Sequence, residues 1–549
     1  MSVAKLGATA PVPADGPPRL PGPTPLLPQP PSDQEKYAYT RRRRVLLVVP
    51  SVVGFTLLVT SQGRLMAAVP ALLPLAPLAV FAVTGYLLSL RVQAFTPAFD
   101  LERHRGLVRD WQPERHPSVD VFLPVCGEPF EIIRNTWRHV RTLADAYPGA
   151  VSCLVLDDGA SAELAALAAE FGFEYLVRPD RGRHKKAGNL RHGFRHSSGR
   201  YILVLDADFA PRPDLLAETV PYLEAEPRLG IVQSPQYFRI LPGQRWIERG
   251  AGAVQELFYR SIQVSRNHHG ASICVGSCAV YRREALAQNG GTTLIEHSED
   301  VHTGFDLRAL GWGLRYLPVN LATGTCPDNM TAFHRQQYRW CVGSMSLMRS
   351  RKFWTLPMPV RTRCCYLAGF CYYLHTALAV LLTPLLPLVL LIALPQSLRA
   401  ANTLWILPAV LSSFLVVPLW HRAPYGPAAW SVRLLYGWAH LFALRDLLLN
   451  RVAAWQPTGS ADARRSTVRG LRTAVVLWSG GTAVLWCAAA LWRVDEELRH
   501  APRAVPGALL LCVSGLLNLL IAGWVVHHAL FRENNAKDAF RTHDDKEAR

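Results

Sequence analysis

The sequence predicts an α/β domain inserted in a multi-span α-helical membrane domain. Of its 549 residues, 50% are hydrophobic and only 18% are charged, whereas about 25% of the residues in a soluble domain are charged. Long apolar runs lie towards both ends of the chain, and short apolar runs alternate with helical patterns between them. A membrane protein with one inserted soluble domain therefore fits better than a chain of soluble domains.

Six segments have the apolar length of a membrane span, which needs about 17 to 25 residues. They lie near residues 45–61, 65–90, 364–394, 403–420, 471–493 and 505–526. Arg41 to Arg44 precede the first segment, and basic residues mark the cytoplasmic side of a span. With about six spans, we expect a multi-pass protein of the plasma (inner) membrane whose inserted domain and both termini are cytoplasmic.

The other segments complete the expected domain organisation. Residues 1–35 contain ten of the 41 prolines and no aromatic residue, a composition that cannot bury a core. We therefore expect residues 1–40 to be a disordered tail, followed by two transmembrane helices in 41–92. The soluble domain occupies 115–350, interfacial helices and about four spans occupy 351–530, and residues 531–549 are a cytoplasmic tail.

Charge and cysteine content exclude two other classes. The 59 Lys and Arg against 41 Asp and Glu give a net charge of +18, but the arginines flank the apolar runs, as membrane topology requires. Nucleic-acid binding is therefore not expected. The 11 cysteines are scattered without a disulfide framework or a strong zinc spacing, so we interpret them as reduced thiols.

Within the soluble domain, four apolar runs are predicted to be buried strands: Val119–Pro124, Val151–Leu156, Tyr201–Leu205 and Ile231–Gln233. A helical pattern from Ser161 to Phe171 follows the second run, and Ser161 is a plausible N-cap. This alternation of strands and helices is typical of a three-layer α/β domain.

Acidic pairs directly follow two of these strands. Asp157 and Asp158 end the second run, and Asp206 and Asp208 follow the third. Open α/β sheets bind ligands at the carboxyl ends of their strands. Two carboxylates two residues apart can hold a hard divalent cation that bridges diphosphate oxygens, although acidic residues also end strands simply as turn formers.

Three further groups could carry chemistry. The basic turn 181–186 contains Lys186 and suits phosphate oxygens. Glu299 and Asp300 follow Ser298 and offer a candidate general base, or equally an N-capped helix start. The run 336–340 offers a Trp face to a sugar ring and Gln and Arg donors to hydroxyls or diphosphate.

Residues 421–470, rich in Trp and Arg, suit a helix at the membrane surface.

These motifs in this order resemble the processive, membrane-integrated inverting glycosyltransferases of family 2, which include bacterial cellulose, hyaluronan and chitin synthases. The family signature Asp-Asp-Gly, His-x-Lys-x-Gly-Asn, Asp-x-Asp, Ser-Glu-Asp and Gln-x-x-Arg-Trp matches residues 157–159, 184–189, 206–208, 298–300 and 336–340. The loop 273–283 is also similar to the acceptor-site loop of cellulose synthases. The resemblance covers the chain from about residue 118 through the last span.

The resemblance implies a nucleotide-sugar glycosyltransferase domain of the GT-A type and assigns roles on the donor side. Asp157 and Asp158 would contact uridine, and Lys186 would bind the diphosphate. Asp206 and Asp208 would contact the nucleotide and bind a Mg or Mn ion.

On the acceptor side, the resemblance implies that Asp300 is the general base, with Glu299 beside it. Gln336, Arg339 and Trp340 would hold the acceptor end of the glucan and the leaving diphosphate. The partners implied are a UDP-sugar, most simply UDP-glucose, the growing polysaccharide, the lipid bilayer and a cell-envelope protein that receives the polymer.

Two family features do not match. Only about 23 residues follow the last expected span, so we expect no cyclic-di-GMP-binding domain. The gating-loop motif is replaced by Trp455-Gln456-Pro457-Thr458-Gly459.

From the resemblance as a whole we expect a processive enzyme that makes a β-glucan and passes it across the membrane. The alternatives are a chitin- or hyaluronan-type synthase, a non-processive enzyme with a lipid acceptor, and a sugar-binding scaffold without catalysis.

Overall fold

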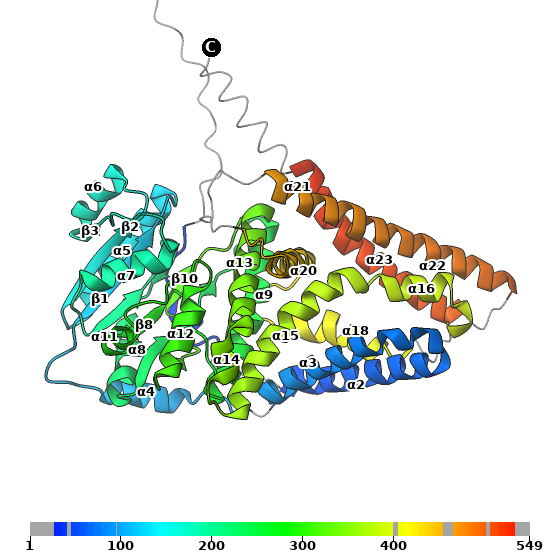
Figure 1. Ribbon diagram of the computed structural model, residues 1–549, viewed down its shortest axis with the longest axis horizontal. Helices are drawn as coiled ribbons and strands as arrows, with labels where there is room; N and C mark the ends of the chain where they lie inside the picture. The colour runs from blue at the N-terminus through cyan, green and yellow to red at the C-terminus, as the bar shows by residue number, and fades with distance from the viewer. Residues whose placement is uncertain are drawn as a thin grey trace, which may run out of the picture.

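The computed structural model describes residues 27–40, 45–94, 96–398, 404–453, 465–500 and 505–532. Figure 1 shows the α/β domain at one end of the molecule and long helices extending from it at the other. The segment 455–459, where the sequence departs from the family's gating loop, lies outside the described residues.

A seven-stranded mixed sheet forms the centre of the α/β domain, in the order β3-β2-β1-β4-β8-β6-β9. Strands β3, β2, β1 and β4 are parallel, β8 is antiparallel to both of its neighbours, and β6 is parallel to β9. Their bounds are β1 Val119–Val125, β2 Val151–Asp157, β3 Glu174–Leu176, β4 Tyr201–Val204, β6 Leu229–Gln233, β8 Ala279–Arg282 and β9 Gly313–Tyr316. All four predicted strands are present.

Alternate residues of the central strands enter two separate cores, one on each face of the sheet. Val121 of β1 packs in the core with helices α5 (Phe130–Ala146), α6 (Ala162–Phe171) and α8 (Leu215–Ala225). Its neighbour Phe122 packs in the other core with α7 (Lys185–Arg195), α11 (Arg283–Gln288) and α12 (Glu299–Ala309). Because side chains alternate along a strand, continuous apolar runs build the predicted three layers. Ser161 caps α6 as predicted, accepting a hydrogen bond from the Leu164 N–H at 3.2 Å.

The domain has a small second sheet of three strands, in the order β5-β10-β7. It consists of β5 (Ala210–Pro211), β10 (Ala322–Gly324) and β7 (Tyr237–Phe238). Strand β10 pairs antiparallel to β5 and parallel to β7. Strand β5 begins two residues after Asp208, and β10 ends directly before Thr325. The second sheet therefore adjoins the loop that contains the second acidic pair.

A group of helices connects the α/β domain to the apolar helices. They are α9 (Trp246–Leu257), a π-helical turn Phe258–Ile262, α10 (Gln263–His268), α13 (Met330–Arg349), α14 (Arg351–Thr355) and α20 (Pro427–Leu448). Helix α20 contacts α9, α13 and α15 (Val360–Leu382), and half of its residues are buried. It is thus a packed joint between the two parts of the molecule and not the amphipathic surface helix expected in 421–470, because its apolar side chains contact neighbours on several sides.

In the part of the chain that the structure describes, five helices are long and apolar enough to cross a membrane: Leu46–Ala68, Pro70–Val92, Val360–Ile392, Arg469–His500 and Val505–Leu530. They comprise α2 (Val45–Ala68), a 3-10 turn Pro70–Leu75, α3 (Ala76–Ala94), α15, α16 (Leu385–Ile392), α21 (Arg465–Thr473), a π-helical segment Ala474–Gly480, α22 (Gly481–His500) and α23 (Val505–His527). The segment expected as a span at 403–420 differs. Among the described residues its apolar helix covers only Leu407–Trp420, which is short for a span.

The chain before the first apolar helix also differs from expectation. Residues 1–26 lie outside the described residues, but 27–40 pack on the α/β domain and include a short helix, α1 (Asp33–Lys36). Lys36 and Tyr39 in this segment are buried. The composition of 1–35 suggested disorder because it offers few apolar side chains, whereas residues 27–40 are held mainly by ion pairs and backbone hydrogen bonds, described below.

Candidate functional site

The candidate site lies at the carboxyl ends of β2, β1 and β4, as the acidic pairs predict. Asp157 is the last residue of β2, and Asp206 and Asp208 lie in the loop that follows β4. Strand β1 lies between β2 and β4 and is parallel to both. The two acidic loops therefore emerge at the same edge of the sheet.

The Asp157 carboxylate is completely buried, and protein donors surround it. One oxygen accepts the Gly159 N–H at 2.6 Å, and the other accepts the Ser161 N–H at 2.9 Å and the Tyr175 hydroxyl at 2.6 Å. The sequence predicts a contact between Asp157 and uridine. In the structure this carboxylate folds the turn that begins α6, and its contact with uridine stays a prediction.

Asp158 is engaged in the same way, by a buried arginine. The Arg178 guanidinium donates two parallel hydrogen bonds to the Asp158 carboxylate, each 2.6 Å long. It also donates to the carbonyl oxygens of Arg183 and Lys185, at 2.5 and 3.0 Å. Asp158 and Arg178 thus fix the path of the basic turn, and neither Asp157 nor Asp158 presents a free carboxylate.

Lys186 projects from the start of α7 towards Asp206. Its ammonium makes an ion pair with Asp206, donates to the Gly276 carbonyl oxygen at 2.8 Å, and lies 4.0 Å from a Glu299 oxygen. Burial alone would lower the pKa of Lys186, but the Asp206 and Glu299 carboxylates outweigh it and raise the pKa overall. The cation therefore stays charged at the point where carboxylates from two loops meet.

Asp208 is held by the residue that follows β10. One Asp208 oxygen accepts both the Thr325 hydroxyl, at 2.6 Å, and the Thr325 N–H, at 3.3 Å. Burial, with a further contribution from the negative charge of Asp206, raises the pKa of Asp208 to about 6, although the Thr325 hydrogen bonds oppose the shift. Two carboxylates that disfavour each other's charge are suited to a cation between them.

The donor set fits a divalent cation that is shared with a substrate. Among the described residues, no group of three or more His, Cys, Asp or Glu side chains could hold a metal ion by itself. Mg²⁺ commonly takes only one or two protein carboxylates and completes its shell with water and substrate phosphates. Asp206 and Asp208 provide that number of ligands, and the ion pair that Asp206 makes with Lys186 shows that this position attracts positive charge.

Glu299 and Asp300 begin α12, on the other side of the Lys186 ammonium. Ser298 occupies the N-cap position with a φ of 54° but makes no capping hydrogen bond with its side chain, so the simple capping interpretation is wrong. The pKa of Asp300 is raised, first by burial and then by the Glu299 carboxylate. Gly276, with a φ of +77°, lies so close that a Cβ there would be 2.8 Å from an Asp300 oxygen.

Gln336, Arg339 and Trp340 lie on one face of α13, since residues three and four apart share a helix face. The Gln336 side-chain oxygen is buried without a hydrogen-bond partner among the described residues. Burial lowers the pKa of Arg339 to about 10, while Glu299 and Asp206 act in the opposite direction. The electrostatic influence of these carboxylates places Arg339 in the same charged cluster.

Four residues of the site were not identified from the sequence. Thr325 and Arg178 hold Asp208 and Asp158, and Gln233 accepts the Val275 N–H and donates to the Ser277 carbonyl oxygen, which orders the loop before β8. Glu128 follows β1, and its pKa is raised by burial and by Asp208 and Asp206. Only Glu128 had a sequence signal, because it follows a predicted strand at the same edge.

The 11 cysteines are free, as expected. Cys274 and Cys278 in the loop before β8 are buried. Burial comes first among the causes that raise the pKa of the Cys274 thiol to about 12. They therefore act as small apolar side chains that pack the loop.

Comparison with known proteins identifies the domain. Residues 201–420 match the family model described as Glycosyl transferase family group 2. The chain is 34% identical over 266 residues to Cellulose synthase 1 of Komagataeibacter xylinus, an alignment that covers 48% of this chain and 17% of that protein. It is 29% identical over 342 residues to the UDP-forming cellulose synthase catalytic subunit of Komagataeibacter sucrofermentans, covering 61% of this chain and 43% of that one.

A solved mannosyltransferase from Pyrobaculum calidifontis, in complex with GDP-Man and Mn²⁺, has a TM-score of 0.44 and 18% identity, covering 69% of this chain and 98% of that chain. The chain spans less than half of the length of the curated relatives named above. The sequence matches confirm the resemblance to bacterial cellulose synthases. Residues 201–420 are thus similar to glycosyl transferase family group 2, and the α/β domain that contains most of them is inserted among apolar helices.

Proposed function

We propose that this protein is an inverting, processive glycosyltransferase that extends a β-linked glucan from UDP-glucose. One observation carries the proposal: Asp206, in the loop after β4, and Glu299, at the start of α12, both lie within 4.0 Å of the Lys186 ammonium of α7, with Asp300 adjacent to Glu299. A cation-binding carboxylate pair for a leaving diphosphate thus lies beside a carboxylate of raised pKa. The similarity to UDP-forming cellulose synthases favours UDP-glucose as donor.

On the donor side, Asp206 and Asp208 would hold a Mg or Mn ion, and Lys186 would bind the diphosphate. The ion would supply charge neutralisation to the diphosphate oxygens. Lys186 would exchange its partner Asp206 for phosphate oxygens when the nucleotide binds. The turn formed by Asp157 and Asp158 would present backbone groups and the basic side chains of 181–185 to the nucleoside.

On the acceptor side, Asp300 would remove the proton from the hydroxyl at the end of the glucan. That oxygen attacks the anomeric carbon as the bond to UDP breaks, so the configuration inverts in a single step. A carboxylate of raised pKa is suited to accept this proton, since proton transfer is most effective when the pKa of the base lies near the working pH. The step needs no covalent enzyme intermediate.

Gln336, Arg339 and Trp340 would bind the acceptor sugar and the leaving diphosphate. Gln336 would offer a sugar hydroxyl its buried oxygen, which has no hydrogen-bond partner in the described ranges, and an indole face can stack on a sugar ring. Arg339 would add positive charge beside the diphosphate. All three would act from the same face of α13.

We place the α/β domain and both termini in the cytoplasm, where UDP-sugars occur, and the apolar helices in the plasma membrane. Polymer made at the junction between the two parts would leave along the apolar helices. A cell-envelope protein would then receive it. Helix α20, packed between the catalytic domain and α15, lies at this junction.

The test is UDP release by detergent-solubilised protein with Mg²⁺ or Mn²⁺, given UDP-glucose, UDP-N-acetylglucosamine or UDP-glucuronate in turn. We expect release with UDP-glucose together with a polymer that a β-glucanase digests. Chitinase-sensitive polymer would move the protein to the chitin-synthase type, and release without polymer would favour a lipid acceptor. Binding of UDP without release from any donor would contradict a catalytic role.

A further inference from the structure

Residues 29–36, which we call the N-terminal clasp, contact residues in or next to all three strands of the small sheet. At β7, the Arg239 guanidinium donates two hydrogen bonds to the Glu35 carboxylate, of 2.8 and 2.6 Å. It also donates to the carbonyl oxygens of Gln29 and Pro30, at 3.2 and 3.0 Å. The Tyr237 hydroxyl donates to the same Glu35 carboxylate at 3.1 Å. The end of β7 is thus fixed to the clasp by one carboxylate and two carbonyls.

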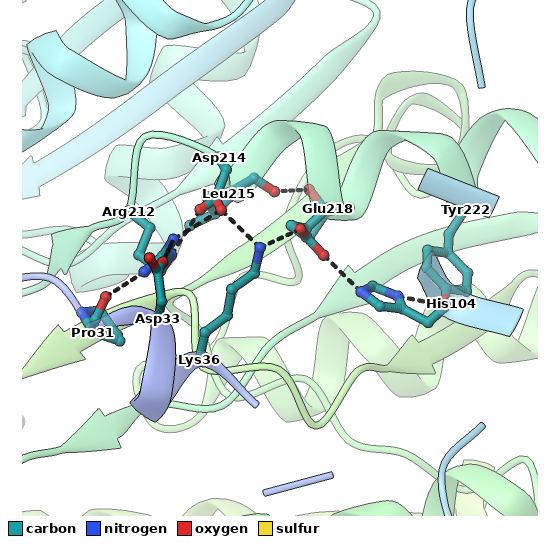
Figure 2. Close-up of polar contacts among 10 residues, drawn as sticks. Pro31, Asp33, Lys36, His104, Arg212, Asp214, Leu215, Glu218 and Tyr222 are labelled. Atoms are coloured by element: carbon teal, nitrogen blue, oxygen red, sulfur yellow. Dashed lines mark hydrogen bonds and ion pairs between the residues drawn. The ribbon is translucent and has the colours of Figure 1, made fainter. Parts of the chain in front are cut away.

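At β5, the clasp binds Arg212, the residue that follows this strand. Figure 2 shows the Arg212 guanidinium between the clasp and the start of α8. It donates to the Pro31 carbonyl oxygen at 2.6 Å, to Asp33 at 2.8 Å and to Asp214 at 2.8 Å. The Arg212 side chain is only 13% exposed, whereas its partner Asp33 is 94% exposed.

At β10, the clasp is joined through backbone groups of the clasp itself. Asn320, two residues before this strand, donates its N–H to the Lys36 carbonyl oxygen at 2.8 Å and its side-chain amide to the Glu35 carbonyl oxygen at 2.9 Å. The Leu321 carbonyl oxygen accepts the Arg212 N–H at 2.8 Å. These bonds fix the position of the residues that lead into β10.

Lys36 anchors the clasp with a buried charge. Its ammonium contacts Asp214, at 2.7 Å, and Glu218, and a Glu218 oxygen is 2.6 Å from a ring nitrogen of His104 in α4 (Leu101–Asp110) (Figure 2). Removing one partner from a buried ion pair leaves an uncompensated charge, which is strongly unfavourable. The clasp is therefore held at one register on the domain.

The strands held by the clasp lead directly to the candidate cation site. Strand β5 begins two residues after Asp208, and Thr325, which binds Asp208, follows β10 without a gap. The two strands pair, with Thr323 opposite Ala210. Phe209 packs so closely on Gly324 that a Cβ there would be 2.3 Å from its ring. A shift between β5 and β10 would therefore separate Thr325 from Asp208.

We propose that the N-terminal clasp is a positioning element for the cation site: its bonds to Arg212, Asn320 and Arg239 hold β5, β10 and β7 in the register that lets Thr325 orient Asp208. Glu35 is the central positioning residue, because its carboxylate accepts from Tyr237 of β7 and its carbonyl oxygen accepts from Asn320, two residues before β10. This inference rests on the proposed function, because the proposed function assigns Asp208 to the cation. It concerns the clasp residues, which do not belong to the proposed substrate site.

The test uses the full chain with Glu35→Ala, Arg239→Ala and the double variant. We expect each single variant to raise the Mn²⁺ concentration for half-maximal UDP release by about five- to 20-fold, with little change in the maximal rate at saturating Mn²⁺. Because the two residues share one ion pair, the double variant should be less impaired than the sum of the two single effects. Glu35→Gln, which keeps an acceptor for Arg239, should lie between wild type and Glu35→Ala.

The control is Arg134→Ala, which removes a more exposed ion pair with Glu170, 3.1 Å long, between α5 and α6. It should leave the Mn²⁺ requirement unchanged. Equal effects of Arg134→Ala and Glu35→Ala would indicate general destabilisation and overturn the proposal, as would unchanged Mn²⁺ dependence in Glu35→Ala.

A second readout does not depend on turnover. Paramagnetic resonance of Mn²⁺ in the presence of UDP should show weaker binding by Glu35→Ala, and hydrogen exchange at the Thr325 amide should be faster than in wild type. If the wild-type protein binds Mn²⁺ and UDP but releases no UDP from donors, the proposed function fails while these measurements still decide the role of the clasp. If Glu35→Ala does not fold, the same two measurements on Glu35→Gln decide it, and wild-type values there would overturn the proposal.

Discussion

Gly343 of α13 lies directly against Ser298, the residue before the Glu299-Asp300 pair. A Cβ at Gly343 would be 2.0 Å from the Ser298 hydroxyl oxygen and 2.2 Å from its Cβ. Ser298 also has a positive φ of 54°, a conformation in which glycine is favoured over residues with a side chain. The position of the candidate base is thus set by contact between α12 and α13.

This contact predicts a paired effect of substitution. Gly343→Ala should push the start of α12 away and lower the maximal rate of UDP release by about 10- to 100-fold, since a displacement of about 1 Å can have that effect. Ser298→Gly makes room for the new methyl group and suits the positive φ, so the double variant should recover most of the rate. Steady-state kinetics with UDP-glucose measure both. An active Gly343→Ala enzyme, or a double variant as impaired as the single one, would contradict the contact's role.

The raised pKa of Asp300 predicts an acid limb in the pH profile. A general base must be ionised, so kcat/KM should fall as the pH falls through the raised pKa of Asp300, well above the pKa of about 3.9 of an ordinary aspartate. Glu299 contributes to the shift, so Glu299→Gln should move the limb to lower pH. The profile is measured as kcat/KM for UDP-glucose between pH 5 and 9. A limb that stays in place in Glu299→Gln would assign it to another group.

Arg178 predicts a large cost for a substitution that keeps its charge. Its side chain is 1% exposed and that of its partner Asp158 is 8% exposed. Arg178→Lys cannot reproduce the two parallel bonds to Asp158 or reach both backbone carbonyls. We expect a lower melting temperature in detergent and weaker UDP binding. Arg178→Met should be more destabilising than Arg178→Lys. It should lower the free energy of unfolding by about 3 to 5 kcal/mol relative to wild type, because it leaves the Asp158 charge buried without a partner. Unchanged UDP affinity in both variants would show that the basic turn does not depend on this pair.

Removal of divalent cations should stop UDP release, and added Mn²⁺ should restore it. Asp208→Asn removes one negative charge from the pair with Asp206, so it should increase the Mn²⁺ requirement by at least about tenfold. Thr325→Val, which removes only the hydroxyl bond to Asp208, should have a smaller effect in the same direction. Titration of UDP release with Mn²⁺ after chelation gives the three values. Full activity in the presence of a chelator would rule out the cation site.

The sheet and its acidic edge could be predicted because their signals are local. Val119–Pro124 and Tyr201–Leu205 are apolar runs of strand length, and the acidic residues follow the strand ends directly. Parallel neighbours place such residues at one edge. The same reasoning could not show that Asp157 and Asp158 are used internally, because the partners Tyr175 and Arg178 lie some twenty residues further on, and only the fold brings them together.

The clasp and the helix α20 could not be predicted for a different reason. Glu35 and Arg239 are 204 residues apart, and ion pairs leave no periodic pattern in a sequence. A Pro-rich segment with few apolar side chains therefore gave a signal of disorder, which long-range charge pairing overrides in residues 27–40. Helix α20 has aromatic and basic residues that suit a membrane surface, but contacts with α9, α13 and α15 bury half of it.

The most direct measurement is UDP release from UDP-glucose by Asp300→Asn beside the wild-type protein, with UDP and Mn²⁺ affinity measured for both. Asparagine keeps the size of the side chain but cannot accept the acceptor's proton, so the account predicts a rate lower by about 10²- to 10⁴-fold. UDP and Mn²⁺ affinity should stay within about threefold of wild type, since Asp300 is not placed on the nucleotide or the cation. An Asp300→Asn protein that releases UDP and elongates glucan at the wild-type rate would contradict the assignment of the base and with it the proposed mechanism.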